Sequence, residues 1–181
     1  MIKPTSETAT IIKSWWRAMH PDQATGYRGD RAGLAKLRRA ATVIEASMEP
    51  AAIDLCHKLG VGPAAMSEVA LIAAVLADLR KASAGDTMAK ALGQPDSAPR
   101  CSALRFRRIL EANDLDTQLT AFRRALALLD HKGDLGDLIQ SLLDWNNQYR
   151  RDARRQRWLY DYYQTTLPLE KPPSIVTETE Q

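Results

Sequence analysis

Arginine side chains are concentrated near the end of the sequence, in the segment 148–163. Five of them follow closely on one another: Arg150, Arg151, Arg154, Arg155 and Arg157, with only Asp152 between them as an opposite charge. On a helix with about 3.6 residues per turn, all of these except Arg155 fall on one broad side. Guanidinium groups stay charged, bind phosphate oxygens in pairs and stack on bases. The segment therefore favours a nucleic-acid-binding helix, while a solvated helix face whose arginine stems cover neighbouring surface stays open as the alternative.

The opposite side of this helix is expected to face the core. It carries Trp145, Tyr149, Gln156, Leu159 and Tyr163. One helix would then present guanidinium groups to solvent and aromatic rings to the interior.

Two further basic groups lie on other expected helices. One comprises Arg28, Arg31, Arg38 and Arg39, and the other comprises Arg105, Arg107 and Arg108. Arg31 and Arg38 are seven positions apart, so they share a helix face. Together with the five arginines of 148–163, these residues form the candidate nucleic-acid-binding set. Arg123 and Arg124 add charge near the middle of another helix.

The overall composition permits a folded protein but does not by itself indicate a nucleic-acid partner. The chain has 181 residues, of which 45% are apolar, which suffices for one domain or two small ones with a real core. The net charge is only +3. A nucleic-acid role must therefore depend on where the charge is located and not on its total.

The sequence lacks the usual motifs of catalysis and of metal binding. Cys56 and Cys101 are not in a CxxC pair, and the three histidines stand far apart, so we expect reduced, buried thiols and no bound metal. No glycine-rich phosphate loop and no GxSxG motif is present. We therefore expect no cofactor and no enzymatic activity. No apolar signal core occurs at the start, and the longest apolar run, 69–77, is too short to cross a bilayer, which favours a cytoplasmic protein without membrane contact.

Helical periodicity recurs along the chain, and no alternating strand pattern accompanies it. The sequence predicts an all-α fold of about eight or nine helices in two packed bundles. The expected parts are an N-terminal bundle over 1–93, a linker over 94–101, a C-terminal bundle over 102–166 and a disordered proline-bearing tail over 167–181. The run 69–77 is apolar on every side, so it should form the central helix of the first bundle.

The order and spacing of several segments resemble a known family. They are Trp15-Trp16, the segment 30–39 (DRAGLAKLRR), Ala91-Leu92-Gly93, the segment 104–110 (LRFRRIL), and the final helix rich in arginine and tyrosine. This arrangement, from about residue 10 to residue 166, resembles the CasB-type small subunit of the type I-E CRISPR surveillance complex, Cascade.

The resemblance implies an all-helical protein without a catalytic site, present in two copies beside the crRNA backbone proteins. Its basic surfaces would help to hold the R-loop, touching the target strand and the path of the displaced strand. The expected partners are other Cascade subunits, crRNA and both DNA strands. The arginines that it carries over are Arg31, Arg38, Arg39, Arg105, Arg107, Arg108, Arg150, Arg151, Arg154 and Arg155.

Two other functions remain open from the residues. A free-standing regulator with a helix-turn-helix would bind DNA alone, but it would usually combine basic residues with base-reading Asn, Gln or Ser on one helix. A scaffold protein would use its arginines in salt bridges to acidic partners, without affinity for nucleic acid.

Overall fold

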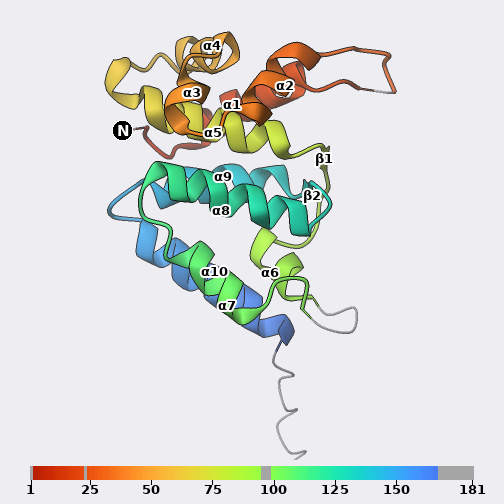
Figure 1. Cartoon of the computed structure of the whole chain (residues 1–181), viewed down its shortest axis with the longest axis vertical. Coiled ribbons are helices and arrows are strands. Elements are labelled where there is room, and N and C mark those ends of the chain that lie inside the picture. Colours follow the sequence, from red (N-terminus) through yellow and green to blue (C-terminus); the bar gives the residue numbers. More distant parts are fainter. Residues whose placement is uncertain (1, 23, 95–98, 167–181) are drawn as a thin grey trace, which may run out of the picture.

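The computed structural model describes residues 2–22, 24–94 and 99–166, and their regular structure is almost entirely helical (Figure 1). The α-helices in this part of the chain are α1 (Ser6–Met19), α2 (Arg31–Arg39), α3 (Val43–Ser47), α4 (Pro50–Leu59), α5 (Met66–Asp78), α6 (Met88–Gly93), α7 (Ala103–Leu110), α8 (Leu115–Leu128), α9 (Leu135–Trp145) and α10 (Arg151–Thr166). A short 3-10 helix, η1 (Pro63–Ala65), precedes α5. Two-residue strands, β1 (Lys81–Ala82) and β2 (Lys132–Gly133), pair in parallel.

The all-α fold class predicted from the sequence is confirmed. The described residues form ten α-helices, more than the expected eight or nine, because the chain breaks between α2 and α3. Ala40 leaves the helical conformation (φ −57°, ψ 116°) and ends α2. Thr42 then caps α3 by accepting a hydrogen bond from the Glu45 N–H at 3.2 Å. The small strand pair was not expected, because two residues are too few to give an alternating pattern.

Capping side chains that are visible in the sequence fix the start of three helices. Asp30, Asp114 and Asp134 each accept a hydrogen bond from the backbone N–H three residues later, at 2.8, 2.9 and 2.8 Å respectively. Such caps satisfy backbone donors that have no partner within the helix. Local sequence therefore determines where α2, α8 and α9 begin.

Helix α5 is the central element of the upper part of the molecule in Figure 1, where α1 to α5 gather above α8 and α9. All of its residues from Val69 to Ala77 are buried. The helix packs against α2, α3 and α4 on one side and against α8 on the other. A helix surrounded in this way must be apolar around its whole circumference, as the sequence predicts.

Aromatic rings join the elements of the lower part, where α6, α7 and α10 lie below α8 and α9 (Figure 1). Phe106 of α7 stacks on Tyr162 of α10 with 4.0 Å between ring centroids. Trp145 of α9 and Trp158 of α10 meet edge to face at 5.2 Å, and Phe122 of α8 contacts both of them. These rings bury large apolar areas and thereby hold four helices together.

Gly93 lets α6 lie directly against α10. A Cβ atom at this position would stand 2.5 Å from the Tyr162 carbonyl oxygen and 2.4 Å from Thr165 Oγ1. Only a residue without a side chain permits such a close approach of two backbones. The glycine in the Ala91-Leu92-Gly93 segment thus serves helix packing.

Buried apolar side chains form one continuous cluster from α1 to α10. The division into bundles over 1–93 and 102–166 stays a prediction, and α6, which precedes the expected boundary, packs against α10. Half of the expected linker, 95–98, and the whole expected tail, 167–181, lie outside the described residues. Cys56 and Cys101 are free and buried, as the sequence predicts.

Among the described residues, only the bent pair Pro50–Leu59 and Pro63–Asp78 reaches the length and apolarity of a membrane span, and no single helix does so.

Burial of α5 predicts the effect of two matched substitutions. Leu71 is fully buried, so Leu71→Ala should lower the free energy of unfolding by about 2–5 kcal/mol in a urea titration. Leu104 is 61% exposed, and Leu104→Ala should change it by less than about 0.5 kcal/mol. Equal losses from both substitutions would contradict the packing described for α5.

Candidate nucleic-acid interface

A groove between α7 and α8 brings together arginines from two helices. Arg105 and Arg108 of α7 and Arg124 of α8 line it, and all three are exposed. Its volume is about 790 Å³, and its apolar lining includes Ile109, Ala112, Ala121, Ala125 and Leu128. Asp116 is the acidic residue among the described lining residues, and one of its oxygens accepts a hydrogen bond from Val43 N at 2.7 Å. The groove is therefore an apolar channel with a positive rim.

The amphipathic sequence of α7 explains this arrangement. Phe106 and Ile109 are the buried residues of α7, Ile109 beneath the groove, which turns Arg105, Arg107 and Arg108 toward solvent. Arg124 was not among the sequence-predicted candidates. Its position beside α7 depends on tertiary packing, and the adjacent pair Arg123-Arg124 gives no sign of which member is exposed.

The arginines near α2 lie in another part of the molecule. Arg28, Arg31 and Arg39 are exposed, whereas Arg38 is half-buried and its Nε donates to the Ala77 carbonyl at 2.6 Å. Burial is the main cause that lowers the pKa of Arg38, and the nearby Arg80 lowers it further. Helices α2 and α7 lie in different layers with α8 between them (Figure 1). The two basic groups therefore lie on helices that are not adjacent, and a role of the α2 arginines in binding nucleic acid stays a prediction.

Helix α10 turns a different face to the core from the one that the sequence indicates. Trp158, Asp161 and Tyr162 are buried, whereas Tyr149 and Leu159 are 82% and 44% exposed. Trp145 is buried as expected, but the expected assignment is wrong for Tyr149 and Leu159, for two reasons. The helix begins only at Arg151, so residues 145 and 149 belong to α9 and to the turn after it. Moreover, charged side chains on its inner face find partners on α9.

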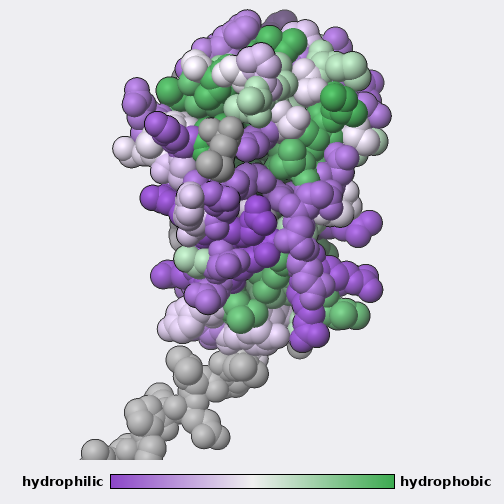
Figure 2. All heavy atoms as spheres, turned by 90° about the vertical axis from the view of Figure 1, so that its left-hand side faces the viewer, coloured by the Kyte–Doolittle hydropathy of each residue, from purple (hydrophilic) through white to green (hydrophobic). Residues whose placement is uncertain are grey.

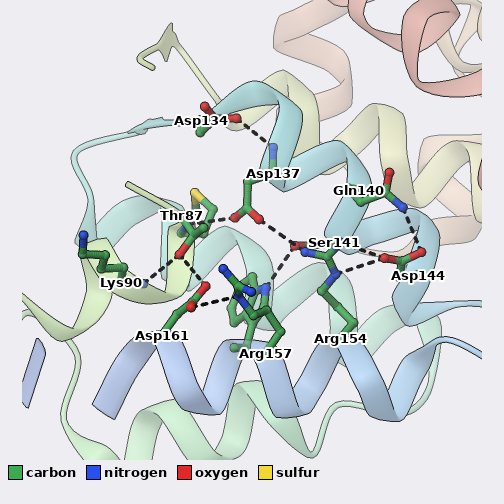
Figure 3. A network of polar contacts seen from close by, with 12 residues as sticks. Thr87, Lys90, Asp134, Asp137, Gln140, Ser141, Asp144, Arg154, Arg157 and Asp161 are labelled. Atoms are coloured by element: carbon green, nitrogen blue, oxygen red, sulfur yellow. Dashed lines mark hydrogen bonds and ion pairs between the residues drawn. The ribbon is translucent and has the colours of Figure 1, made fainter. Parts of the chain in front are cut away.

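Arg154 is the centre of a buried ion cluster between α9 and α10 (Figure 3). Its Nε and Nη2 donate to Asp144 Oδ2 at 3.0 and 2.8 Å, and its Nη1 lies 3.4 Å from Asp137 Oδ1. Only 16% of the Arg154 side chain and 9% of the Asp144 side chain are exposed. Gln140 donates to the other Asp144 oxygen at 2.9 Å. Arg154 thus holds the fold together, and we do not place it in the nucleic-acid interface.

The same polar network continues to α6 (Figure 3). Asp137 Oδ2 accepts from the Met88 N–H at 2.8 Å, and Asp161 Oδ2 accepts from Thr87 Oγ1 at 2.9 Å. Arg157 pairs with the second Asp161 oxygen at 3.0 Å while its side chain stays 65% exposed. Burial raises the pKa of Asp137, although the Met88 N–H and Arg154 each act to lower it. Three helices are therefore tied together by carboxylates that the solvent hardly reaches.

The remaining arginines of this segment are tied to backbone carbonyls or lie at the edge of the ion cluster. Arg151 Nε donates to the Trp145 carbonyl at 2.9 Å. Arg155 Nη2 donates to the Ala112 carbonyl at 3.0 Å and lies over the Trp145 ring, and burial lowers its pKa. Arg150 is 53% exposed and stands 3.4 Å from Asp144. Of the five, Arg150 and Arg157 keep most of their surface in solvent.

Arg123 is a structural residue that the sequence did not identify. Its two Nη atoms donate to the carbonyls of Ala40 and Leu37 at 2.6 and 2.7 Å, and its Nε lies 2.8 Å from Asp78 Oδ2. It therefore satisfies carbonyls at the C-terminal end of α2, where a positive charge is favourable.

Figure 2 shows the side of the molecule that carries the α7–α8 and α9–α10 turns. A broad hydrophilic belt crosses its middle, with apolar patches above and below. The exposed residues of these turns include both signs of charge, such as Glu111, Asp114 and Arg150, and Asp152 follows in the first turn of α10. Among the described residues, no group of three His, Cys, Asp or Glu side chains is arranged to hold a metal ion.

Comparisons with known proteins agree with this fold. Residues 33–163 match the sequence model of the family of CRISPR-associated protein Cse2. The structure is similar to CasB from Thermus thermophilus, with a TM-score of 0.62 and 24% identity, over 88% of this chain and 99% of that one. It is equally similar to a second crystal structure from Thermus thermophilus, of a CRISPR-associated protein of the Cse2 family, with a TM-score of 0.62, 25% identity and the same coverage. No curated protein matches the sequence. These matches confirm the resemblance to the CasB-type small subunit.

The role of Arg154 predicts a large loss of stability on substitution. Arg154→Met keeps an apolar stem but removes the two hydrogen bonds to the buried Asp144 Oδ2, so the free energy of unfolding should fall by about 3 kcal/mol. The control Arg107→Met, on the exposed side of α7, should change it by less than about 0.5 kcal/mol. Urea titration of both variants measures the difference, and a similar small effect in both would refute the structural role.

Burial of Asp137 predicts a pH dependence. Because its pKa is raised in the folded state, the folded protein binds this proton more tightly than the unfolded chain does. The stability that the protonated carboxyl contributes is therefore complete at a pH below its ordinary pKa of about 4 in the unfolded chain. It is lost as the pH rises through the raised pKa of the folded protein. The difference in unfolding free energy, wild type minus Asp137→Asn, should decrease over that range. An increase with pH would show that pairing with Arg154 outweighs burial.

Proposed function

Because the chain belongs to the Cse2 family of CRISPR-associated proteins, we propose that it is a non-catalytic subunit of the type I-E surveillance complex Cascade whose exposed arginines hold nucleic acid. The partners in this proposal are crRNA, the target and displaced DNA strands, the other subunits and a second copy of this chain. A cytoplasmic location follows from membership of such a complex.

The observation that carries this proposal is the positive rim of the α7/α8 groove. Arg105, Arg108 and Arg124 come from two helices and face one channel. Arg107 adds a further exposed charge on α7. Guanidinium groups arranged along a groove can follow a sugar–phosphate backbone without reading its sequence.

This kind of contact suits a complex in which base pairing reads the sequence. The protein then needs to support only the shape and the backbone of the nucleic acid. A displaced DNA strand can re-anneal with the target strand and expel the guide. Arginines that hold the displaced strand make re-annealing less favourable. These residues therefore need no base-specific contact with the nucleic acid.

The free-standing regulator is less well supported. Its recognition helix would carry Asn, Gln or Ser beside the basic residues. Helix α7, which carries the arginines of the groove, contains none of these residue types. Its eight residues are either apolar or arginine.

We expect the double substitution Arg105→Ala and Arg108→Ala to shorten the lifetime of the R-loop formed by the assembled complex. It should also reduce the salt dependence of DNA binding, by about 0.7–0.9 in the slope of log K against log salt for each phosphate that is no longer neutralised. The measurement is dissociation of target DNA at several salt concentrations. Co-purification with crRNA-containing particles shows whether the variant still assembles.

A charge-matched control removes two exposed cations from other helices, Arg17 of α1 and Lys58 of α4. The variant Arg17→Ala/Lys58→Ala should leave the R-loop lifetime and the salt slope unchanged. If the groove variant assembles and behaves like this control, its arginines do not hold nucleic acid.

A further inference from the structure

The α7/α8 groove has an apolar floor. The half-buried Leu128 and the 5% exposed Ile109 contribute to this floor, and Arg105, Arg108 and Arg124 stand on its rim. An apolar channel with a positive rim suits an extended segment that offers aliphatic side chains and carboxylates together.

The groove begins close to the end of α10. Cys101 lines the groove, and its carbonyl oxygen accepts a hydrogen bond from Tyr162 Oη at 2.6 Å. The last described residue, Thr166, follows Tyr162 by one helical turn and donates from Oγ1 to the Tyr162 carbonyl at 3.3 Å. The segment that follows α10 therefore starts at the end of the groove near the first turn of α7.

The sequence of 167–181 has the chemistry that the groove requires. It contains three glutamates, Glu170, Glu178 and Glu180, against one lysine, Lys171. It also contains the aliphatic pair Ile175-Val176, shortly before the last two glutamates. Carboxylates for the arginine rim and an aliphatic side chain for the floor are thus close together in the sequence.

The segment is also long enough. The nine residues from 167 to 175 span up to about 30 Å when extended. The eight residues of α7 extend over only about 12 Å. Attachment to α10 would keep the segment at an effective concentration in the millimolar range, so even a weak contact would be populated.

We propose that the α7/α8 groove is the docking site of the chain's own C-terminal segment 167–181. Ile175 or Val176 lies on the apolar floor, and Glu178 and Glu180 pair with the arginines of the rim. The contact covers these arginines in the free subunit and is released when a polynucleotide binds the rim. The contact itself does not depend on the proposed function, whereas its competition with nucleic acid rests on that function.

A methyl NMR spectrum of the full chain tests the contact without nucleic acid. Ile175→Ser/Val176→Ser should shift the δ1-methyl resonance of Ile109 and leave those of Ile12 and Ile72, buried in α1 and α5, unchanged. The control Thr177→Ser/Thr179→Ser, in the same segment, should shift none of the three. An unchanged Ile109 resonance in the first variant overturns the proposal. A shift that disappears on dilution also overturns it, because the groove would then hold the segment of a second copy.

Affinity for a short single-stranded oligonucleotide tests the competition. If the segment occupies the groove in about 70–90% of molecules, its release should tighten binding about three- to tenfold. We expect this gain from Glu178→Gln/Glu180→Gln in the full chain. The charge-matched control Glu7→Gln/Asp54→Asn, with both changes outside the groove, should gain less than about twofold. A shifted Ile109 resonance with unchanged affinity would support the contact and count against nucleic-acid binding by these arginines.

Discussion

The pairing of Arg154 with Asp144 and Asp137 is the constraint on which the lower part of the molecule depends. A charge removed from water is tolerated only when a partner of opposite sign and good geometry replaces the lost hydration. Arg154 meets this condition with two hydrogen bonds to one oxygen of Asp144, so α10 can pack on α9 in one rotation only. That rotation buries Trp158 and leaves the neighbouring arginines at the edge of the cluster.

The arginines of the chain divide into two groups by their physical role. Arg123, Arg151, Arg154 and Arg155 hold helix ends or carboxylates within the fold. Arg105, Arg108 and Arg124 instead face solvent at the groove. A high local density of arginine therefore does not by itself mark a binding surface. The densest arginine segment supplies most of the internal contacts, and the sparser groups supply more of the exposed charge.

Much of the fold could be predicted from the sequence because its determinants are local. The capping aspartates and the fully apolar run 69–77 act within one or two helical turns, so their effects can be read from neighbouring residues. The rotation of α10 could not be predicted in this way. The sequence places the arginines in solvent because a charge is costly to bury. For Arg154 this cost is removed by Asp144, which lies ten residues away on another helix. The contribution of Arg124 to the groove likewise depends on how α8 packs beside α7.

The exchange of arginine Nε–Hε protons with water tests this division most directly. In ¹⁵N-edited NMR spectra of the full chain at neutral pH, the Hε protons of Arg151 and Arg154 should be protected, since both Nε atoms donate to buried oxygens. The Hε proton of Arg107, which is exposed on α7 outside the groove, should exchange rapidly. A protected Arg107, or a rapidly exchanging Arg154, would contradict this division of the arginines.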